Sequence, residues 1–181
     1  MLRDQLLAFV PLESGGVRVR RFTEADITDD YVSWLNDPAV VRFSNQRFLS
    51  HTSASCQAFY SSIEASDSAL LVIEYADLGF VGTMTVHFNE RHGTADMGIL
   101  IGDARVRGFG VGATAWITVM SQVLSLPGIR KVTAGTLSCN QPMLSVISKA
   151  GMEADGIRKA QELVDGVPYD ICYFAAFRAD G

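Results

Sequence analysis

The sequence predicts one α/β domain of the α+β kind, in which about four helices pack on a mixed, mostly antiparallel sheet of about seven strands. Three observations lead to this prediction. The chain of 181 residues is 48% hydrophobic, which suffices for one well-buried core. Strand-like and helix-like periodicities alternate along it, without internal repeats. A glycine-rich stretch, Arg105–Gly112, separates an extended segment from a helical one.

The first part of the chain is expected to supply one strand and two helices. Residues 1–16 are expected to form an N-terminal arm of the single domain 1–181, and residues 17–22 alternate apolar side chains with arginine, as a strand does. Thr23-Glu-Ala-Asp26 resembles a capping box and predicts a helix start. Pro38 ends this helix, because the residue before a proline disfavours the helical conformation. A second helix is predicted after Thr52.

The remaining elements are a three-stranded meander, a helix, a strand, a shorter helix and a final hairpin. In chain order they are strands 70–75, 80–88 and 94–101, a helix ending at Pro127-Gly128, strand 131–136, helix 141–149, and strands 157–164 and 169–177. Asp165-Gly166 is a favoured hairpin turn. The nearby Pro168 predicts a turn longer than two residues.

The glycine-rich stretch has the features of an anion site. Gly108, Gly110 and Gly112 lack a Cβ atom, so the backbone can approach a ligand closely. The first N–H groups of the following helix have no intrahelical acceptor, and the helix dipole attracts negative charge there. Arg105 and Arg107 add two cations. A diphosphate fits such a loop, and the alternative is that the glycines serve only a tight turn.

Charge and cysteine content narrow the classes of function. A net charge of −5 argues against a nucleic-acid surface and allows a neutral or cationic substrate. Cys56, Cys139 and Cys172 are widely spaced, which favours neither a disulfide framework nor a metal site and fits a reducing cytoplasm. Residues 1–11 are unlike a signal peptide or a membrane span. We therefore expect a cytoplasmic protein without a metal, nucleic-acid or membrane partner.

The order of elements and two motifs resemble the GNAT acetyltransferases. The family signature, a basic or amide residue followed by x-x-Gly-x-Gly, is similar to Arg107-Gly-Phe-Gly-Val-Gly112. Asn140–Met152 looks like the family's segment after its fifth strand, with an Asn, a short helix and Lys-x-Gly-hydrophobic. Ala95-Asp-Met-Gly98 and Trp34-Leu-Asn-Asp-Pro38 are similar to the branch of ribosomal-protein N-terminal and several amino-sugar acetyltransferases. The resemblance covers residues 17–177.

This resemblance implies acetyl-CoA as co-substrate and no metal. GNAT proteins splay the sheet between their strands 4 and 5, here 94–101 and 131–136, and the pantetheine arm lies in the gap. The backbone of Leu100 and Ile101 would bind that arm from one side and Asn140 from the other, with a helix cap as the alternative role of Asn140. The pyrophosphate would lie beside Arg107 on the backbone of Gly108, Phe109, Gly110, Val111, Gly112 and Ala113.

The implied reaction is direct attack of a primary amine on the thioester in a ternary complex, which requires a neutral nitrogen. At pH 7, neutralising an alkyl ammonium costs about 4 to 5 kcal/mol, and neutralising an α-amino group about 1 to 1.5 kcal/mol. Asp96 is the first candidate for the general base or for a carboxylate acting through water, and a purely structural role is its alternative. His87, Glu90 and Asp170 are further candidates.

One position departs from the family pattern. Many members carry a tyrosine four residues before the glycine that closes the last helix, where it protonates the thiolate, and this chain has Ile147 there. Ser145, Ser148 or a water could take that role, although release of a thiolate costs only about 2 kcal/mol at neutral pH. The missing phenol favours an acceptor of modest basicity, such as a peptide α-amine or an amino sugar.

The acceptor is expected to bind between the first helix, residues 38–52 and the last hairpin, where Trp34, Tyr169 and Tyr173 offer aromatic surfaces. We therefore predict an N-acetyltransferase that acts on a small-molecule or peptide amine, as a monomer or homodimer. The alternative is a non-catalytic acyl-CoA-binding regulatory domain. A dinucleotide-binding domain is disfavoured, because the loop lacks the G-x-G-x-x-G spacing.

Overall fold

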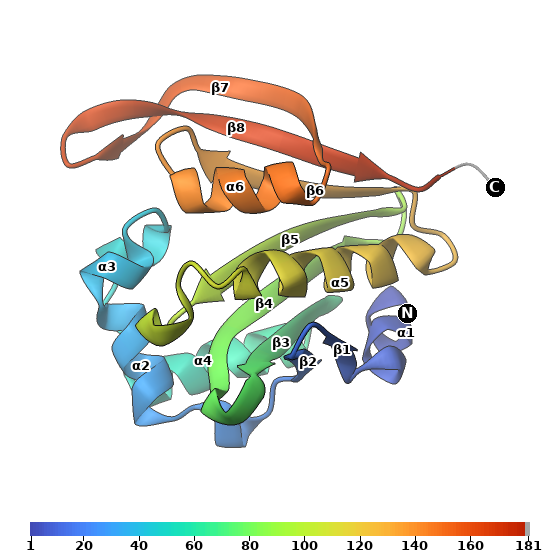
Figure 1. The fold of residues 1–181 in the computed structure, drawn as a ribbon, viewed down its shortest axis with the longest axis horizontal. Helices are drawn as coiled ribbons and strands as arrows, with labels where there is room; N and C mark the ends of the chain where they lie inside the picture. The colour runs from blue at the N-terminus through green and yellow to red at the C-terminus, as the bar shows by residue number, and fades with distance from the viewer. Residues whose placement is uncertain (180–181) are drawn as a thin grey trace.

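One eight-stranded sheet organises the molecule, in the order β1-β2-β3-β4-β5-β6-β8-β7 (Figure 1). The structure is a computed structural model that describes residues 1–179. Neighbouring strands pair antiparallel except β5 and β6, which are parallel, so the predicted mixed, mostly antiparallel sheet is confirmed. The strands are β1 Leu12–Ser14, β2 Val17–Arg21, β3 Ser68–Tyr75, β4 Gly79–Asn89, β5 Thr94–Ile101, β6 Lys131–Leu137, β7 Glu153–Val164 and β8 Val167–Phe177.

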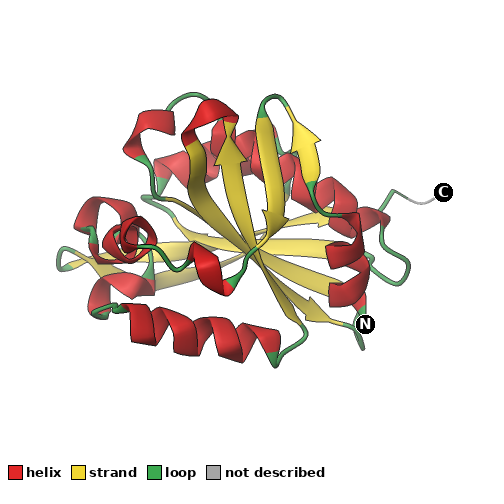
Figure 2. Ribbon diagram, turned by 90° about the horizontal axis from the view of Figure 1, so that it is seen from below, coloured by secondary structure: helices red, strands yellow, loops and turns green. Residues whose placement is uncertain are grey.

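Helices cover both faces of the sheet (Figure 2). Within residues 1–179 the α-helices are α1 Leu2–Phe9, α2 Asp29–Asn36, α3 Pro38–Val41, α4 Ser53–Glu64, α5 Val111–Ser125 and α6 Gln141–Lys149. Short 3-10 helices lie at η1 Glu24–Asp26, η2 Asn45–Phe48, η3 Ala76–Leu78 and η4 Ala104–Val106. The main core lies between the sheet and α1, α5 and α6, and a smaller core lies under α2 and α4.

The apolar stripe of α5 carries the main core, as its helical spacing indicates. Trp116 and Val119 are fully buried against strand residues such as Met84 and Val132. On the other face, the rings of Phe22 and Tyr31 lie 5.4 Å apart between β2 and α2. Each helix thus buries one face, which fixes the strand order on which the site depends.

The N-terminal segment is more structured than an arm. Residues 1–16 form α1 and β1, and Leu6 of α1 is completely buried. The sheet therefore has eight strands where about seven were predicted, since β1 pairs with β2 across a Gly15-Gly16 turn. The predicted first helix also begins later. The capping box of Thr23 and Asp26 exists but encloses η1, and α2 begins after Thr28.

The predicted length of the last hairpin turn was wrong. Val164 pairs directly with Val167, so Asp165 and Gly166 alone form the turn, both at positive φ. A two-residue turn of this kind matches the twist of the flanking strands. Pro168 is tolerated because its partner pair with Leu163 follows the hydrogen-bonded closing pair Val164–Val167, so its nitrogen faces away from β7. On that other side, β6 pairs with β8 only from Ile171 onward.

Candidate cofactor and acceptor site

The sheet splits between β5 and β6. These strands pair over only three residues, Thr94–Asp96 with Lys131–Thr133, and the remaining length of each has no strand partner on that side. The predicted splay between the fourth and fifth predicted strands is thereby confirmed. In Figure 1, the two strands lie together at one end and diverge toward the amino end of α5. Residues 97–101 of β5 and 134–137 of β6 border the gap.

The glycine-rich loop lies at the wide end of this gap. β5 ends at Ile101, η4 follows, and α5 begins at Val111. Gly108 and Gly110 have φ values of +83° and +79°, and a Cβ on either would meet nothing within 4 Å. Gly110 caps α5 without a side chain, and its carbonyl accepts the first intrahelical hydrogen bond, from the N–H of Thr114. The N–H groups of residues 111–113 therefore have no intrahelical acceptor. The loop offers backbone donors and open space, as an anion site requires.

The two arginines of the loop differ. Arg105 is engaged with Asp103, to which its Nη2 donates over 2.6 Å. These hydrogen bonds hold the pKa of the Asp103 carboxyl below its usual value, with a smaller contribution from the nearby charge of Arg107. Arg107 is exposed and forms no ion pair with any residue in the range 1–179. The free cation of the loop is therefore Arg107, while Arg105 neutralises a buried carboxylate.

The opposite side of the gap leads from β6 into α6. Asn140 caps α6 by accepting from the N–H of Met143, and its amide donates to the Thr136 hydroxyl over 3.0 Å. Its predicted cap is therefore present, and its contact with pantetheine stays a prediction. Ile147 is buried in the main core, and Ser145 is exposed on α6. The predicted role of Ser145 also stays a prediction.

A polar row crosses the sheet at the closed end of the gap, on the face away from α5. The Thr133 hydroxyl donates to the Asp96 carboxylate over 2.6 Å, joining β6 to β5 in the last paired row. His87 is the register partner of Asp96 on β4, and its Nδ1 lies 2.8 Å from the Ser68 hydroxyl. Asp96 is exposed. A carboxylate therefore stands at the apex of the gap, where it can contact a group entering from this face.

The other base candidates lie elsewhere. Glu90 accepts from the N–H of Leu2 beside α1, beyond the closed end of the gap. Asp170 accepts from the N–H of Ala160 on the last hairpin. That backbone hydrogen bond, together with one from Lys159, lowers the pKa of Asp170.

Two glycines that the sequence analysis did not single out as a pair face each other across the gap. Asp96 pairs with Thr133, so Gly98 and Gly135 occupy equivalent positions two residues further, on the same face. A Cβ on Gly98 would lie 2.8 Å from Thr85 Oγ1, and one on Gly135 would lie 3.1 Å from the Tyr173 ring. The opening therefore has glycine on both edges, flanked by Thr85 and Tyr173. The sequence signal that could have revealed this pair is the pattern polar-apolar-Gly, which both Asp96–Gly98 and Thr133–Gly135 share.

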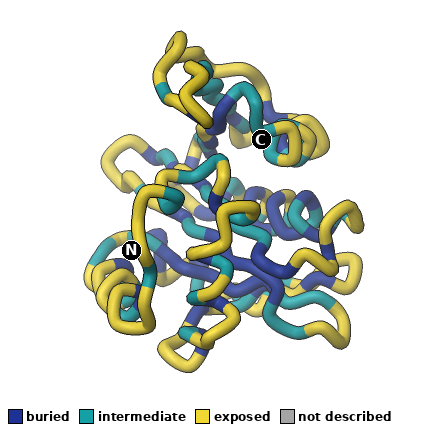
Figure 3. Tube along the Cα trace, turned by 90° about the vertical axis from the view of Figure 1, so that its left-hand side faces the viewer, coloured by how far each residue is buried: buried dark blue, intermediate teal, exposed yellow. Residues whose placement is uncertain are grey.

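The far end of the opening is bridged on the same face. Arg42, after α3, pairs with Asp165 at the hairpin tip over 3.1 Å. Arg47 of η2 pairs with Glu162 over 3.5 Å and donates to the Leu163 carbonyl. The predicted acceptor segments, residues 38–52 and the last hairpin, thus contact each other directly. β7 is mostly exposed, whereas most residues of β8 are half-buried (Figure 3).

Helix α2 is tied to the start of the glycine-rich loop. The Trp34 ring packs directly on Gly102, since a Cβ there would lie 2.0 Å from Trp34 Cδ2. The N–H groups of Gly102 and Asp103 both donate to the Val81 carbonyl. Trp34 also contacts the Phe80 ring edge to face, with centroids 5.1 Å apart. Helix α2 therefore fixes the point where β5 leads into the glycine-rich loop.

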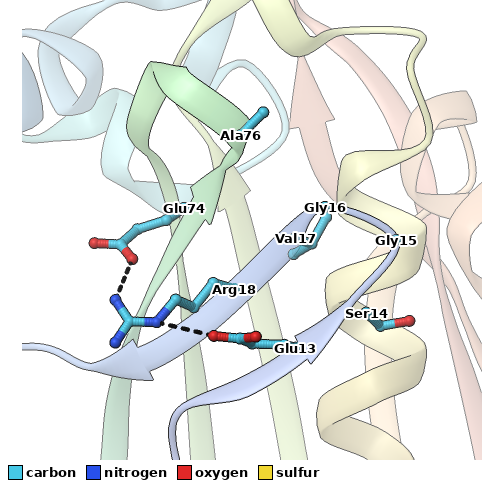
Figure 4. Close-up of a pocket in the computed structure, with 8 residues that line it drawn as sticks. All are labelled: Glu13, Ser14, Gly15, Gly16, Val17, Arg18, Glu74 and Ala76. Carbon is cyan, nitrogen blue, oxygen red and sulfur yellow. Dashed lines mark hydrogen bonds and ion pairs between the residues drawn. The ribbon is translucent and has the colours of Figure 1, made fainter.

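A separate pocket of about 520 Å³ lies outside the gap, around the β1–β2 turn (Figure 4). Its charged side chains satisfy one another, because Arg18 pairs with Glu13 over 3.4 Å and with Glu74 over 2.9 Å. The β5–β6 gap combines unpaired strand edges inside the sheet with the free N–H groups at the start of α5, so we place the site there. In the described part of the chain, no His, Cys, Asp and Glu side chains gather in a group that could hold a metal ion. No helix between residues 1 and 179 has the length and apolarity needed to cross a membrane.

A split mixed sheet whose gap ends at a backbone anion loop defines a class of α/β proteins that bind an elongated, phosphate-bearing co-substrate. A family model for the acetyltransferase (GNAT) domain matches residues 17–153. The chain therefore belongs to the GNAT acetyltransferase family, and it is an acetyltransferase. A comparison with curated protein sequences gave no match.

Solved structures share the fold at low identity. The spermidine N-acetyltransferase of Vibrio cholerae, solved with CoA and spermine, has a TM-score of 0.80 and 14% identity, covering 92% of this chain and 98% of that one. A ribosomal L7/L12 α-N-protein acetyltransferase solved with CoA has a TM-score of 0.79 and 14% sequence identity, and the match covers 92% of this chain and 97% of that one. The Microcin C7 self-immunity acetyltransferase, solved with acetyl-CoA and AMP, has a TM-score of 0.78 and 13% sequence identity, and the match covers 91% of this chain and 93% of that one.

Proposed function

We propose that the chain transfers an acetyl group from acetyl-CoA, the donor used by its family, to a primary amine by direct attack in a ternary complex. One observation carries the proposal: the unpaired edges of β5 and β6 lead from the Asp96 carboxylate to a loop with free N–H groups and the unpaired Arg107. The pantetheine arm lies along the edge of β5 at Leu100 and Ile101, with Asn140 opposite. The pyrophosphate lies on residues 108–113.

The amine reaches the thioester from the face that carries Asp96, through the opening between Gly98 and Gly135. Asp96 accepts the amine proton directly or through a water, and its bond to Thr133 holds it in place. Since the thiol of CoA has a pKa near 8.5, its release as a thiolate costs only about 2 kcal/mol at neutral pH. A strong acid is therefore not needed, and Ser145 or a water is a sufficient proton donor. This chemistry is easiest for amines of modest basicity, and we propose a peptide α-amine or an amino sugar as acceptor.

Two measurements test the proposal. In calorimetry, acetyl-CoA should bind the wild-type chain, and Arg107→Ala should weaken binding about tenfold because a charge-assisted hydrogen bond is lost. Arg105→Ala is the matched control and should weaken binding less, since Arg105 is already paired with Asp103. A thiol-release assay with peptides, amino sugars and polyamines should then show amine-dependent release. Binding without release would instead indicate a regulatory acyl-CoA-binding domain.

A further inference from the structure

The wall of the opening formed by β7 and β8 carries one cation that has no acidic partner. The other cations of this region are neutralised: Arg42 by Asp165, Arg47 by Glu162, and Lys159 by Asp170. Arg158 is exposed and pairs with no carboxylate among the described residues. Its guanidinium lies over the Tyr173 ring instead, 5.3 Å from the centroid.

Tyr173 connects this cation to the opening. Tyr173 is the register partner of Gly135 on β6, and its ring covers the face of Gly135, where a Cβ would meet it at 3.1 Å. Gly135 lies two residues beyond Thr133 in the same strand, which is about 7 Å at strand spacing. The Asp96 carboxylate and the stacked Arg158 therefore lie on the same face of the sheet, on opposite sides of the glycine opening.

The backbone is irregular directly after Arg158. The β7–β8 register shifts immediately after Arg158, so residues 159–161 form a bulge opposite Asp170. Ala160 has a φ of +46°, which is uncommon for a residue with a side chain, and its N–H donates to the Asp170 carboxylate over 2.8 Å. Bulges of this kind often re-aim side chains beside active sites. Here the bulge interrupts the β7–β8 register directly after the residue that carries the unpaired cation.

We propose that Arg158, stacked on Tyr173, binds an anionic group of the acceptor, so that the preferred substrate is a primary amine that also carries a carboxylate or a phosphate. This inference rests on the proposed function and specifies its acceptor. The amine lies toward Asp96, and the anion lies on the guanidinium, which presents several donors in one plane to such oxygens. An acidic peptide and an amino-sugar phosphate share this chemistry. Polyamines lack the anion.

Matched acceptor pairs test the proposal. The first pair is glucosamine 6-phosphate and glucosamine, and the second is the amide of the tripeptide Ser-Glu-Ala and that of Ser-Gln-Ala. The wild-type chain should prefer the anionic member of at least one pair, and which pair responds identifies the source of the anion. Arg158→Ala should lower kcat/KM for that anionic member about 10- to 100-fold and change the uncharged member little. The preference should also weaken as salt is added.

Lys159→Ala is the matched control, because it removes a neighbouring positive charge that Asp170 already neutralises. Arg158→Lys should retain part of the preference. The acetyl-CoA dissociation constant and the thermal unfolding midpoint should be unchanged in both alanine variants. Equal losses for charged and uncharged acceptors, or a wild-type preference for spermidine or for the uncharged members, would overturn the assignment of Arg158.

A binding measurement separates this inference from the proposed function. If no amine supports thiol release, the proposed function fails, and Arg158 is then tested by calorimetry with glucosamine 6-phosphate and the Ser-Glu-Ala amide in the presence of CoA. Binding that Arg158→Ala weakens tenfold or more supports the anion site. Absence of binding by both probes, or binding that the substitution leaves unchanged, rejects it.

Discussion

At the scale of single residues, Asp96 is the group on which the proposed chemistry depends most. Asp96→Asn keeps the size of the side chain and its bond to Thr133 but removes the basic oxygen. We expect kcat to fall about 10²- to 10⁴-fold, the range that general-base catalysis contributes, while the acetyl-CoA dissociation constant stays within about twofold. Steady-state kinetics with calorimetry measures both. Thr133→Val should have a smaller effect, and a fully active Asp96→Asn variant would reassign the base.

Gly102 provides a second test at this scale, because its hydrogen atoms lie where the Trp34 ring leaves no room for a methyl group. Gly102→Ala should destabilise the fold by about 1 to 3 kcal/mol through overpacking. For a chain of this size the unfolding midpoint should fall by about 2 to 12 °C. Gly156→Ala is the control, since a Cβ there would meet nothing within 4 Å. Equal midpoints for the two variants would contradict the packing of Trp34 on this backbone.

At the scale of elements, an ion network joins β2, β3 and η1. Arg20 binds Asp26 over 2.7 Å and Glu74 over 2.7 Å. Burial alone would raise the pKa of Asp26, but hydrogen bonds from Arg20 and Thr23 outweigh it, so this pKa lies below the ordinary 3.8. Because the folded pKa is the lower one, the stabilisation is complete well above 3.8 and disappears as pH falls through the folded value.

Asp26→Asn should therefore destabilise the chain at pH 7 by about 1 to 3 kcal/mol, since charge-assisted hydrogen bonds and a cap are lost. The difference from wild type should shrink as the pH falls through the folded pKa of Asp26, which lies below 3.8, because the wild-type carboxylate is then protonated as well. Urea unfolding at a series of pH values measures this. Glu24→Gln is the control, an exposed acid without an ion pair in the described chain. A pH-independent difference would show that the network contributes no electrostatic stability.

Sequence periodicity predicted the longer elements because packing decides them. The stripe of α5 fixes its buried face, and the glycine-rich loop could be placed between β5 and α5. The periodicity did not reveal β1, since three residues are too few to show an alternation. It also did not place the start of α2, because the capping box of Thr23 closes the shorter helix η1 first. The equivalent positions of Gly98 and Gly135 on the two sides of the gap were also missed. They depend on the register between two strands far apart in sequence, which local pattern does not specify.

At the scale of the whole molecule, only three residue pairs of β5 and β6 join the part containing α6, β7 and β8 to the rest of the sheet. A co-substrate that fills the gap should therefore stabilise the entire fold. At acetyl-CoA concentrations about 100 times the dissociation constant, binding contributes about 2.7 kcal/mol, and the unfolding midpoint should rise by about 5 to 11 °C.

Hydrogen exchange should locate this stabilisation. Amides of residues 97–101 and 108–113 should exchange more slowly with acetyl-CoA bound, while those at the β1–β2 turn should not change. Slowing at the turn around Gly15 and Gly16, with none along β5, would move the co-substrate to the pocket on the opposite edge of the sheet.

The ion pairs of Arg42 and Arg47 with the hairpin tip have a geometric consequence for the acceptor. Together with the Asp96–Thr133 bond at the other end, they turn the gap from a notch with a free margin into an aperture with a complete rim. A molecule cannot slide into an aperture sideways; it has to be threaded through tip first. If the proposed function holds, we therefore expect the nucleophilic nitrogen to sit at the slender extremity of its carrier, as it does on an unstructured chain terminus or a monosaccharide, and not on the broad flank of a globular surface.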